Sequence, residues 1–203
     1  MKIKGVTVIN EGYVHCSSNF YSAHDILNNL KFSFSVGINK ITGEIDSGIW
    51  AISYLLSMYR YKPENFVLFQ QPTVLVNDEN MSLDELAEFS CYMDTSYPLF
   101  SDNVSVRELV SNGLKYSKIK YTVDDIKSLF SLSDKRFESS LSTVGNEIFR
   151  AMSAVAFAYD KQIFCFPWLS KMRFDKYHQN LTILLQMLEK FNKTVILPIG
   201  ISI

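Results

Sequence analysis

Gly43-Glu-Ile-Asp-Ser-Gly48 is a short polar turn with a glycine at each end, and it joins two apolar segments. Residues 40–42 lead into this glycine loop from a strand-like segment, and apolar residues at helical spacing follow it over 50–60, up to Pro63. A strand, a glycine-containing turn and a helix in this order form the start of a layered α/β unit. The loop therefore predicts an α/β fold, and the rest of the chain is interpreted outward from it.

Strands are predicted on both sides of this unit from runs of alternating or continuous apolar residues. Four of them are 2–9, 30–36, 66–69 and 73–76, the last two as a pair. Ser82-Leu-Asp-Glu85 is a capping box that predicts a short helix, because serine and glutamate at this spacing satisfy the first free amides of a helix. Cys91 to Met93 is predicted as another short strand.

The C-terminal third repeats a helix followed by an apolar strand. A helix over 144–158 precedes the buried strand 162–166, and a helix over 177–191 precedes the strand 194–197. Short apolar strands alternating with helices are typical of a parallel or mixed sheet with helices on its faces. The pattern therefore predicts that the strands 162–166 and 194–197 belong to a central sheet covered by helices.

The segment from about 100 to 140 differs in composition from the units around it. Ser105-Val-Arg-Glu108 and Thr122-Val-Asp-Asp125 have the form of capping boxes, and 127–137 is polar with scattered apolar positions. We predict a single domain over 1–203, with a small helical lobe at 100–140 inserted in the α/β core.

Composition excludes several classes of protein. Lys plus Arg (20) nearly equals Asp plus Glu (21), so no overall field attracts nucleic acid. Cys16, Cys91 and Cys165 form no C-x-x-C pair, which argues against a disulfide framework or a zinc site and favours a cytoplasmic protein. The apolar stretch 151–169 is interrupted by Asp160-Lys161 and is too short to span a membrane. We therefore expect no metal, no nucleic-acid partner and no direct membrane insertion.

The glycine loop has the glycine spacing of the phosphate-binding pattern G-x-x-x-x-G-K-[ST] but not the residues that follow it. Ile49 stands where lysine would reach the phosphates, and Trp50 where a hydroxyl would ligate Mg²⁺. An ordinary strand-to-helix turn explains the two glycines equally well. The candidate phosphate-loop positions are Gly43, Asp46, Ser47, Gly48, Ile49 and Trp50.

Three later stretches occur in an informative order. Ser96-Tyr-Pro-Leu-Phe100 is followed by Leu141-Ser142-Thr143-Val144-Gly145 and then by Ile163-Phe-Cys-Phe166. In order and spacing they resemble the nucleotide-binding ATPase domain of ABC transporters, which is P-loop NTPase-like. They are similar to the segment after its Q-loop, to its LSGGQ signature and to its Walker B strand.

The resemblance implies a set of replaced ATP-handling residues. It places Thr95 at the Q-loop glutamine, Pro167 and Trp168 at the two Walker B acids, and Ile199 at the switch histidine. Neither Pro167 nor Trp168 can coordinate magnesium or activate water. The resemblance therefore implies a domain that keeps the scaffold without ATP hydrolysis and without a cofactor, since fold and chemistry are separable. Trp50 and Trp168 are expected to fill the former nucleotide pocket.

On this basis the chain is predicted to be a non-catalytic, pseudo-ATPase subunit of an ABC-type transporter complex. It would pair with an active ABC ATPase subunit, with a membrane permease, or with both, and would reach the membrane through the permease. The resemblance makes Ser96, Tyr97 and Phe100 partner-facing, and assigns Leu141, Ser142 and Gly145 to a signature-like loop that meets the partner.

Two other functions stay open from the sequence. One is a small α/β transferase or hydrolase whose site the sequence does not locate, and the other is a regulator that binds a small molecule in the remodelled pocket. His15-Cys16 is badly placed for a nucleophile and base pair because neighbours on a strand point to opposite faces. The basic and aromatic cluster at 115–121 is interpreted as a solvated face.

Overall fold

The computed structural model describes residues 1–10, 14–18, 21–26, 30–61, 66–68, 71–101 and 103–201. A four-stranded parallel sheet lies at the centre of this part of the chain, with the strand order β5-β11-β10-β9. Its strands are β5 (Gly37–Thr42), β9 (Ser90–Tyr92), β10 (Ile163–Cys165) and β11 (Thr194–Ile199). Every residue of β9, β10 and β11 is buried, as expected of parallel strands covered on both faces.

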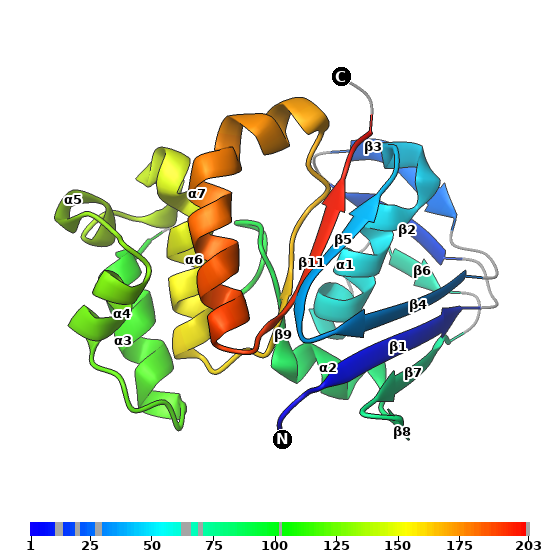
Figure 1. Cartoon of the computed structure of the whole chain (residues 1–203), viewed down its shortest axis with the longest axis horizontal. Helices are drawn as coiled ribbons and strands as arrows, with labels where there is room; N and C mark the ends of the chain where they lie inside the picture. The colour runs from blue at the N-terminus through cyan, green and yellow to red at the C-terminus, as the bar shows by residue number, and fades with distance from the viewer. Residues whose placement is uncertain are drawn as a thin grey trace.

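Antiparallel strands form the other side of the molecule (Figure 1). One sheet has the order β4-β1-β7-β8, and a three-stranded sheet has the order β3-β2-β6. The first contains β1 (Gly5–Asn10), β4 (Leu30–Ser35), β7 (Thr73–Val76) and β8 (Glu79–Asn80). The second contains β2 (Val14–Ser18), β3 (Tyr21–Ile26) and β6 (Phe66–Leu68).

The predicted pairing of 66–69 with 73–76 is wrong. Strand β6 pairs with β2, whereas β7 pairs with β1. The register of β1 and β7 sets Val6 opposite Val76 and Val8 opposite Val74, and all four side chains are buried. An apolar pattern identifies a strand and its buried face but not its neighbour, and here the match between buried valines belongs to a strand far away in the sequence.

Helix α1 (Ile49–Met58) lies between the two sides of the molecule, and all ten of its residues are buried. It contacts β9, β10 and β11 of the parallel sheet and also α2 (Leu83–Phe89). A helix that is apolar all round must be covered all round. The position of α1 therefore fixes the spacing of the layers.

Helices α6 (Ile148–Ala158) and α7 (Lys171–Lys190) lie on the other side of the parallel sheet from α1 (Figure 1). The fold is thus α/β, with a parallel sheet between helices and added antiparallel strands, as predicted. The segment predicted as a lobe contains the helices α3 (Val106–Tyr116), α4 (Val123–Leu129) and α5 (Asp134–Phe137). That these helices form a lobe inserted in a single domain over 1–203 stays a prediction.

Helix α7 begins at Lys171, six residues before the predicted start at 177. Ser170 is its cap, and the Ser170 hydroxyl accepts a hydrogen bond of 3.2 Å from the amide of Arg173. The first two turns are largely exposed and polar, so they lack the apolar periodicity from which the helix was predicted. Within the described ranges, no helix is long and apolar enough to cross a membrane.

Capping boxes fix two helix starts as predicted. The Ser82 hydroxyl accepts from the Glu85 amide at 3.2 Å, and the Ser82 amide donates to the Glu85 carboxylate at 2.9 Å. These hydrogen bonds favour the ionised carboxylate and lower the pKa of Glu85. Thr122 and Asp125 make the same reciprocal pair at the start of α4.

We expect Ser82→Ala to lower the free energy of unfolding by about 1 kcal/mol, because the first turn of α2 loses its cap. Chemical denaturation followed by circular dichroism measures the change. Ser128→Ala is the control, since Ser128 is an exposed helical residue in α4 and does not cap it. Equal stability of the Ser82 and Ser128 variants would contradict the assigned role of the capping box.

Candidate functional site

The four parallel strands end at one edge of the sheet, called here the carboxyl edge. The glycine loop follows β5, the Thr95 segment follows β9, Pro167-Trp168 follows β10, and Ile199-Gly200 ends β11. Open α/β sheets bind their ligands outside the carboxyl ends of their strands. The structure thus assembles at one edge most of the positions that the sequence singled out.

Direct contacts join three of these segments. The amide of Gly43 donates to the carbonyl of Ile199 at 3.0 Å, and the indole Nε1 of Trp168 donates to the carbonyl of Gly43 at 3.1 Å. Leu169 continues this link, with its amide donating to the Pro198 carbonyl at 3.1 Å. The start of the glycine loop is therefore held by the segments that follow β10 and β11.

The glycine loop is folded on itself. Its centre is a 3₁₀ turn, Ile45–Ser47, in which the amide and hydroxyl of Ser47 both donate to the carbonyl of Glu44, at 3.0 and 2.6 Å. Gly48 has φ +85°, a left-handed conformation that favours glycine. A Cβ on Gly43 would lie 2.6 Å from the Ser47 hydroxyl. The left-handed conformation at Gly48 and the close approach of Ser47 to Gly43 account for the two glycines.

The residues after the loop belong to the core. Ile49 is 7% exposed and Trp50 is 1% exposed. The Trp50 ring packs edge-on against Tyr54 of the same helix, and Tyr54 packs edge-on against Tyr92 of β9. These side chains are apolar at the positions where a magnesium triphosphate requires an ammonium and a hydroxyl group, so they do not fit that ligand.

Trp168 lies against two glycines at the carboxyl edge. Besides its hydrogen bond to Gly43, its ring passes so close to Gly200 that a Cβ there would be 2.7 Å from Cζ2 of the indole. The two tryptophans do not fill one pocket, which corrects the expectation from the sequence. Trp168 lies beside the glycine loop, whereas Trp50 packs inside the core. Pro167 and Trp168 offer no carboxylate to a metal ion. Among the described residues there is no cluster of His, Cys, Asp or Glu that would hold one.

The signature-like residues lie in the turns that precede α6. Leu141 is buried, whereas Ser142 and Gly145 are exposed. The Arg136 guanidinium donates to the carbonyl of Thr143 at 2.6 Å, which holds this turn against α5. Gly145 has φ +68°. An exposed, anchored turn is available to another molecule, but its side chains carry no charge.

Two of the three residues predicted to face a partner are buried. Tyr97 is 1% exposed and donates its hydroxyl to the carbonyl of Ser90 at 3.0 Å, and Phe100, 4% exposed, packs against the Tyr97 ring. Burial raises the pKa of Tyr97. Only Ser96 presents its side chain at the surface. The sequence did not reveal that a buried carbonyl satisfies the Tyr97 hydroxyl. Tyr97 and Phe100 therefore do not face a partner, and the partner-facing role of Ser96 stays a prediction.

The other candidate residues form no site in the described part of the chain. Cys91 and Cys165 are buried free thiols, and burial raises the pKa of Cys165 to about 12 and that of Cys91 in the same direction. His178 is exposed and its Nδ1 lies 3.0 Å from the Thr182 hydroxyl. The side chains of His15, Cys16, His24 and Asp25 lie outside the described residues, as does that of Asp46.

The lysine and tyrosine cluster at 115–121 begins in the last turn of α3 and continues into the segment before α4. Lys115, Lys118 and Lys120 are exposed and Tyr116 is 83% exposed, while Tyr121 packs its ring against Phe157 and Phe191.

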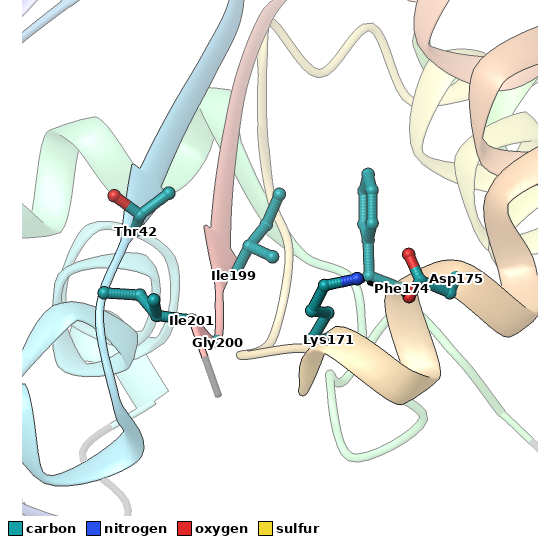
Figure 2. Close-up of a pocket in the computed structure, with 7 residues that line it drawn as sticks. All are labelled: Thr42, Lys171, Phe174, Asp175, Ile199, Gly200 and Ile201. Atoms are coloured by element: carbon teal, nitrogen blue, oxygen red, sulfur yellow. Dashed lines mark hydrogen bonds and ion pairs between the residues drawn. The ribbon is translucent and has the colours of Figure 1, made fainter. Parts of the chain in front are cut away.

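Sequence reasoning missed a cavity of about 380 Å³ at the carboxyl edge (Figure 2). Its lining residues come from the end of β5, the end of β11 and the first turns of α7: Thr42, Lys171, Phe174, Asp175, Ile199, Gly200 and Ile201. Because the helix was predicted to begin at 177, the side chains at 171–175 were not assigned to one helical face. The i,i+4 spacing of Lys171 and Asp175 was the available signal.

Two solved ABC proteins have a similar arrangement. The chain matches a bacterial Atm1-family ABC exporter with ATP bound at a TM-score of 0.63 and 14% identity, over 98% of this chain and 35% of that one. It matches the ATP-binding cassette MJ0796, in a dimeric post-hydrolysis state bound to ADP and Pi, at a TM-score of 0.63 and 11% identity, over 97% and 88%. This chain has an ABC ATPase fold.

The likeness is one of structure and not of sequence. No protein-family model matches the ABC ATPase-like chain, and a search of curated proteins finds no match. The chain spans about a third of the exporter's length. At identities of 14% and 11% the comparisons establish the fold alone.

Contact between Trp168 and Gly200 gives a testable coupling. We expect Gly200→Ala to destabilise the protein by about 1–3 kcal/mol, because the added methyl group overlaps the indole. In a Trp168→Leu background the same change is expected to cost at least about 0.5 kcal/mol less. Denaturation of the four proteins of this double-mutant cycle measures the coupling, and strict additivity would contradict the contact.

The two core thiols are expected to be unreactive in the folded protein. A raised pKa leaves little thiolate, and burial excludes the reagent, so iodoacetamide should modify Cys91 and Cys165 about 100-fold more slowly than in the unfolded chain. Peptide mass spectrometry after timed labelling at about pH 8 measures both rates, with guanidinium-unfolded protein as the control. Similar rates in the folded and unfolded states would contradict this assignment.

Proposed function

We propose that this ABC ATPase-like chain is a non-catalytic subunit that acts by pairing with an active ABC ATPase subunit, with a membrane permease, or with both. The observation that carries the proposal is Trp168. It stands at the end of β10, where the resemblance places a catalytic acid, and its indole is hydrogen-bonded to the first residue of the glycine loop. The loop thus contacts a side chain of its own domain at the edge where such folds handle a ligand.

Further support comes from the residue types gathered at the carboxyl edge. Ile49 replaces the lysine that neutralises phosphate charge, and Pro167 replaces the metal-associated acid in the same resemblance. Loss of these groups together removes neutralisation, metal binding and water activation, on which phosphoryl transfer depends. The strands and helices around them remain closely packed, which favours a scaffold retained for binding.

Exposed polar turns supply the surface for such pairing. Ser142 and Gly145 are exposed on an anchored turn before α6, and Ser96 is exposed after β9. The amide and hydroxyl of Ser96 both donate to the Asp94 carboxylate, at 2.9 and 2.7 Å, so the turn after β9 is also fixed. Pre-formed turns of this kind lower the entropic cost of association.

The catalytic half of the proposal is tested with nucleotide. Isothermal titration with Mg·ATP should show no saturable binding at micromolar concentrations, and the purified chain should not release phosphate. An intact ABC ATPase domain, assayed in parallel, is the positive control. Sub-micromolar binding of Mg·ATP, or phosphate release that disappears with a change confined to the glycine loop, would overturn the proposal.

The partner half is tested by crosslinking and affinity purification from the native cell. We expect an ABC ATPase subunit or a multi-span permease to be recovered with the wild-type chain. Ser142→Arg should reduce that recovery several-fold, because a large charged side chain then projects from the exposed turn. Ser33→Arg on β4, at the opposite side of the molecule, is the matched control (Figure 1). Recovery of neither class of partner by the wild-type chain would count against the proposal.

A further inference from the structure

The cavity beside α7 is a separate feature from the glycine loop. Thr42 and Ile201 lie on one side of it and Phe174 and Asp175 on the other, with Ile199 and Lys171 between them (Figure 2). Where the side chains of the glycine loop are described, none of them lines the cavity. Its volume of about 380 Å³ falls within the range of small-molecule sites, and it lies at the carboxyl edge where α/β sheets bind ligands.

Apolar side chains form most of its wall. Ile199 is 8% exposed and closes the cavity toward the sheet, whereas Ile201 is 62% exposed at its mouth. The Phe174 ring is stacked on the exposed His178 ring, with the two centroids 5.9 Å apart. A ligand that enters this cavity therefore buries an apolar body against two isoleucines and an aromatic ring.

One ammonium and one carboxylate group line the cavity, and a second ammonium group lies near its aromatic wall. Lys171 Nζ lies 2.8 Å from the Asp175 carboxylate, and Lys40 Nζ lies 5.9 Å from the centroid of the Phe174 ring. Two ammonium groups thus accompany one carboxylate, and the half-exposed pair leaves Lys171 able to bind a second anion. The exposed Thr42 residue adds a hydroxyl group on the opposite wall. This combination complements a single negative charge on an apolar molecule.

Backbone hydrogen bonds fix the wall that the ends of β5 and β11 form. The Gly43 amide ties the end of β5 to Ile199, and the Gly200 amide donates to the Leu169 carbonyl at 2.8 Å. Gly200 itself lies against Trp168 and Ser170, since a Cβ there would be 2.7 Å from the indole and 3.3 Å from Ser170 Cα. A site with fixed walls does not have to be ordered on binding, which favours affinity for a small ligand.

We infer that this cavity binds a small apolar carboxylate, with the apolar body against Phe174, Ile199 and Ile201 and the carboxylate at Lys171. The inference concerns a different site from the glycine loop and does not depend on the proposed pairing function. It would make the chain responsive to a metabolite through a surface next to the carboxyl edge.

Phenylacetate is the probe for this site, and amide NMR signals of the full chain report where it binds. Titration should give saturable shifts centred on Thr42, Lys171 and Ile199. The neutral isostere phenylacetamide should bind about fivefold more weakly, since a half-exposed ion pair contributes up to about 1 kcal/mol. Acetate, which lacks the apolar body, should bind more weakly than either.

Three variants separate the contributions. Lys171→Met should remove the preference for phenylacetate over phenylacetamide while keeping the apolar contact, and Lys190→Met in the last turn of the same helix should leave the preference unchanged. Thr42→Trp fills the mouth from an exposed position and should abolish binding of both probes. The inference is overturned by an absence of saturable shifts up to about 10 mM phenylacetate, by shifts centred elsewhere, or by equal affinity for the amide.

Discussion

Burial of helix α1 is the constraint on which the rest of the structure depends. Its ten residues are all buried and none is charged, so the helix is stable only when other elements cover every side of it. The parallel sheet covers one side and α2 contributes another, while the antiparallel strands lie across the molecule (Figure 1). Because α1 begins at Ile49, directly after the glycine loop, the same burial places that loop at the carboxyl edge.

This constraint also determines what the loop offers to a ligand. A phosphate-binding helix start needs a polar first turn that reaches outward, since lysine and hydroxyl groups must meet the phosphates and metal. Here the first turn contains Ile49 and Trp50, which are buried in the core. The indole of Trp168 donates a hydrogen bond to the carbonyl of Gly43. The apolar first turn and the tryptophan at the end of β10 are consistent parts of one arrangement.

Local signals predicted the elements better than their neighbours. Ser82 and Thr122 fixed helix starts because a capping box is complete within four residues, and buried strands such as β10 were visible as apolar runs. The pairing of β7 with β1, by contrast, depends on contacts between residues about seventy positions apart. The early start of α7 was hidden because its first turns face outward.

Predictions for the site show the same division. The alternating helices and apolar strands predicted a parallel or mixed sheet, and the glycine loop, the segment after β10 and the end of β11 meet at the carboxyl edge that parallel strands share. Burial of Tyr97 was not predictable, since it depends on the Ser90 carbonyl and on the Tyr61 ring 5.4 Å away. The cavity was missed because it combines Thr42 with residues 199–201, far away in the sequence, and with a first turn of α7 that was not predicted as helix. Trp168 connects the glycine loop with the cavity. Its indole donates a hydrogen bond to Gly43 of the loop, and its ring leaves space only for glycine at position 200, which lines the cavity. The same side chain that holds the glycine loop therefore also shapes the wall of the cavity.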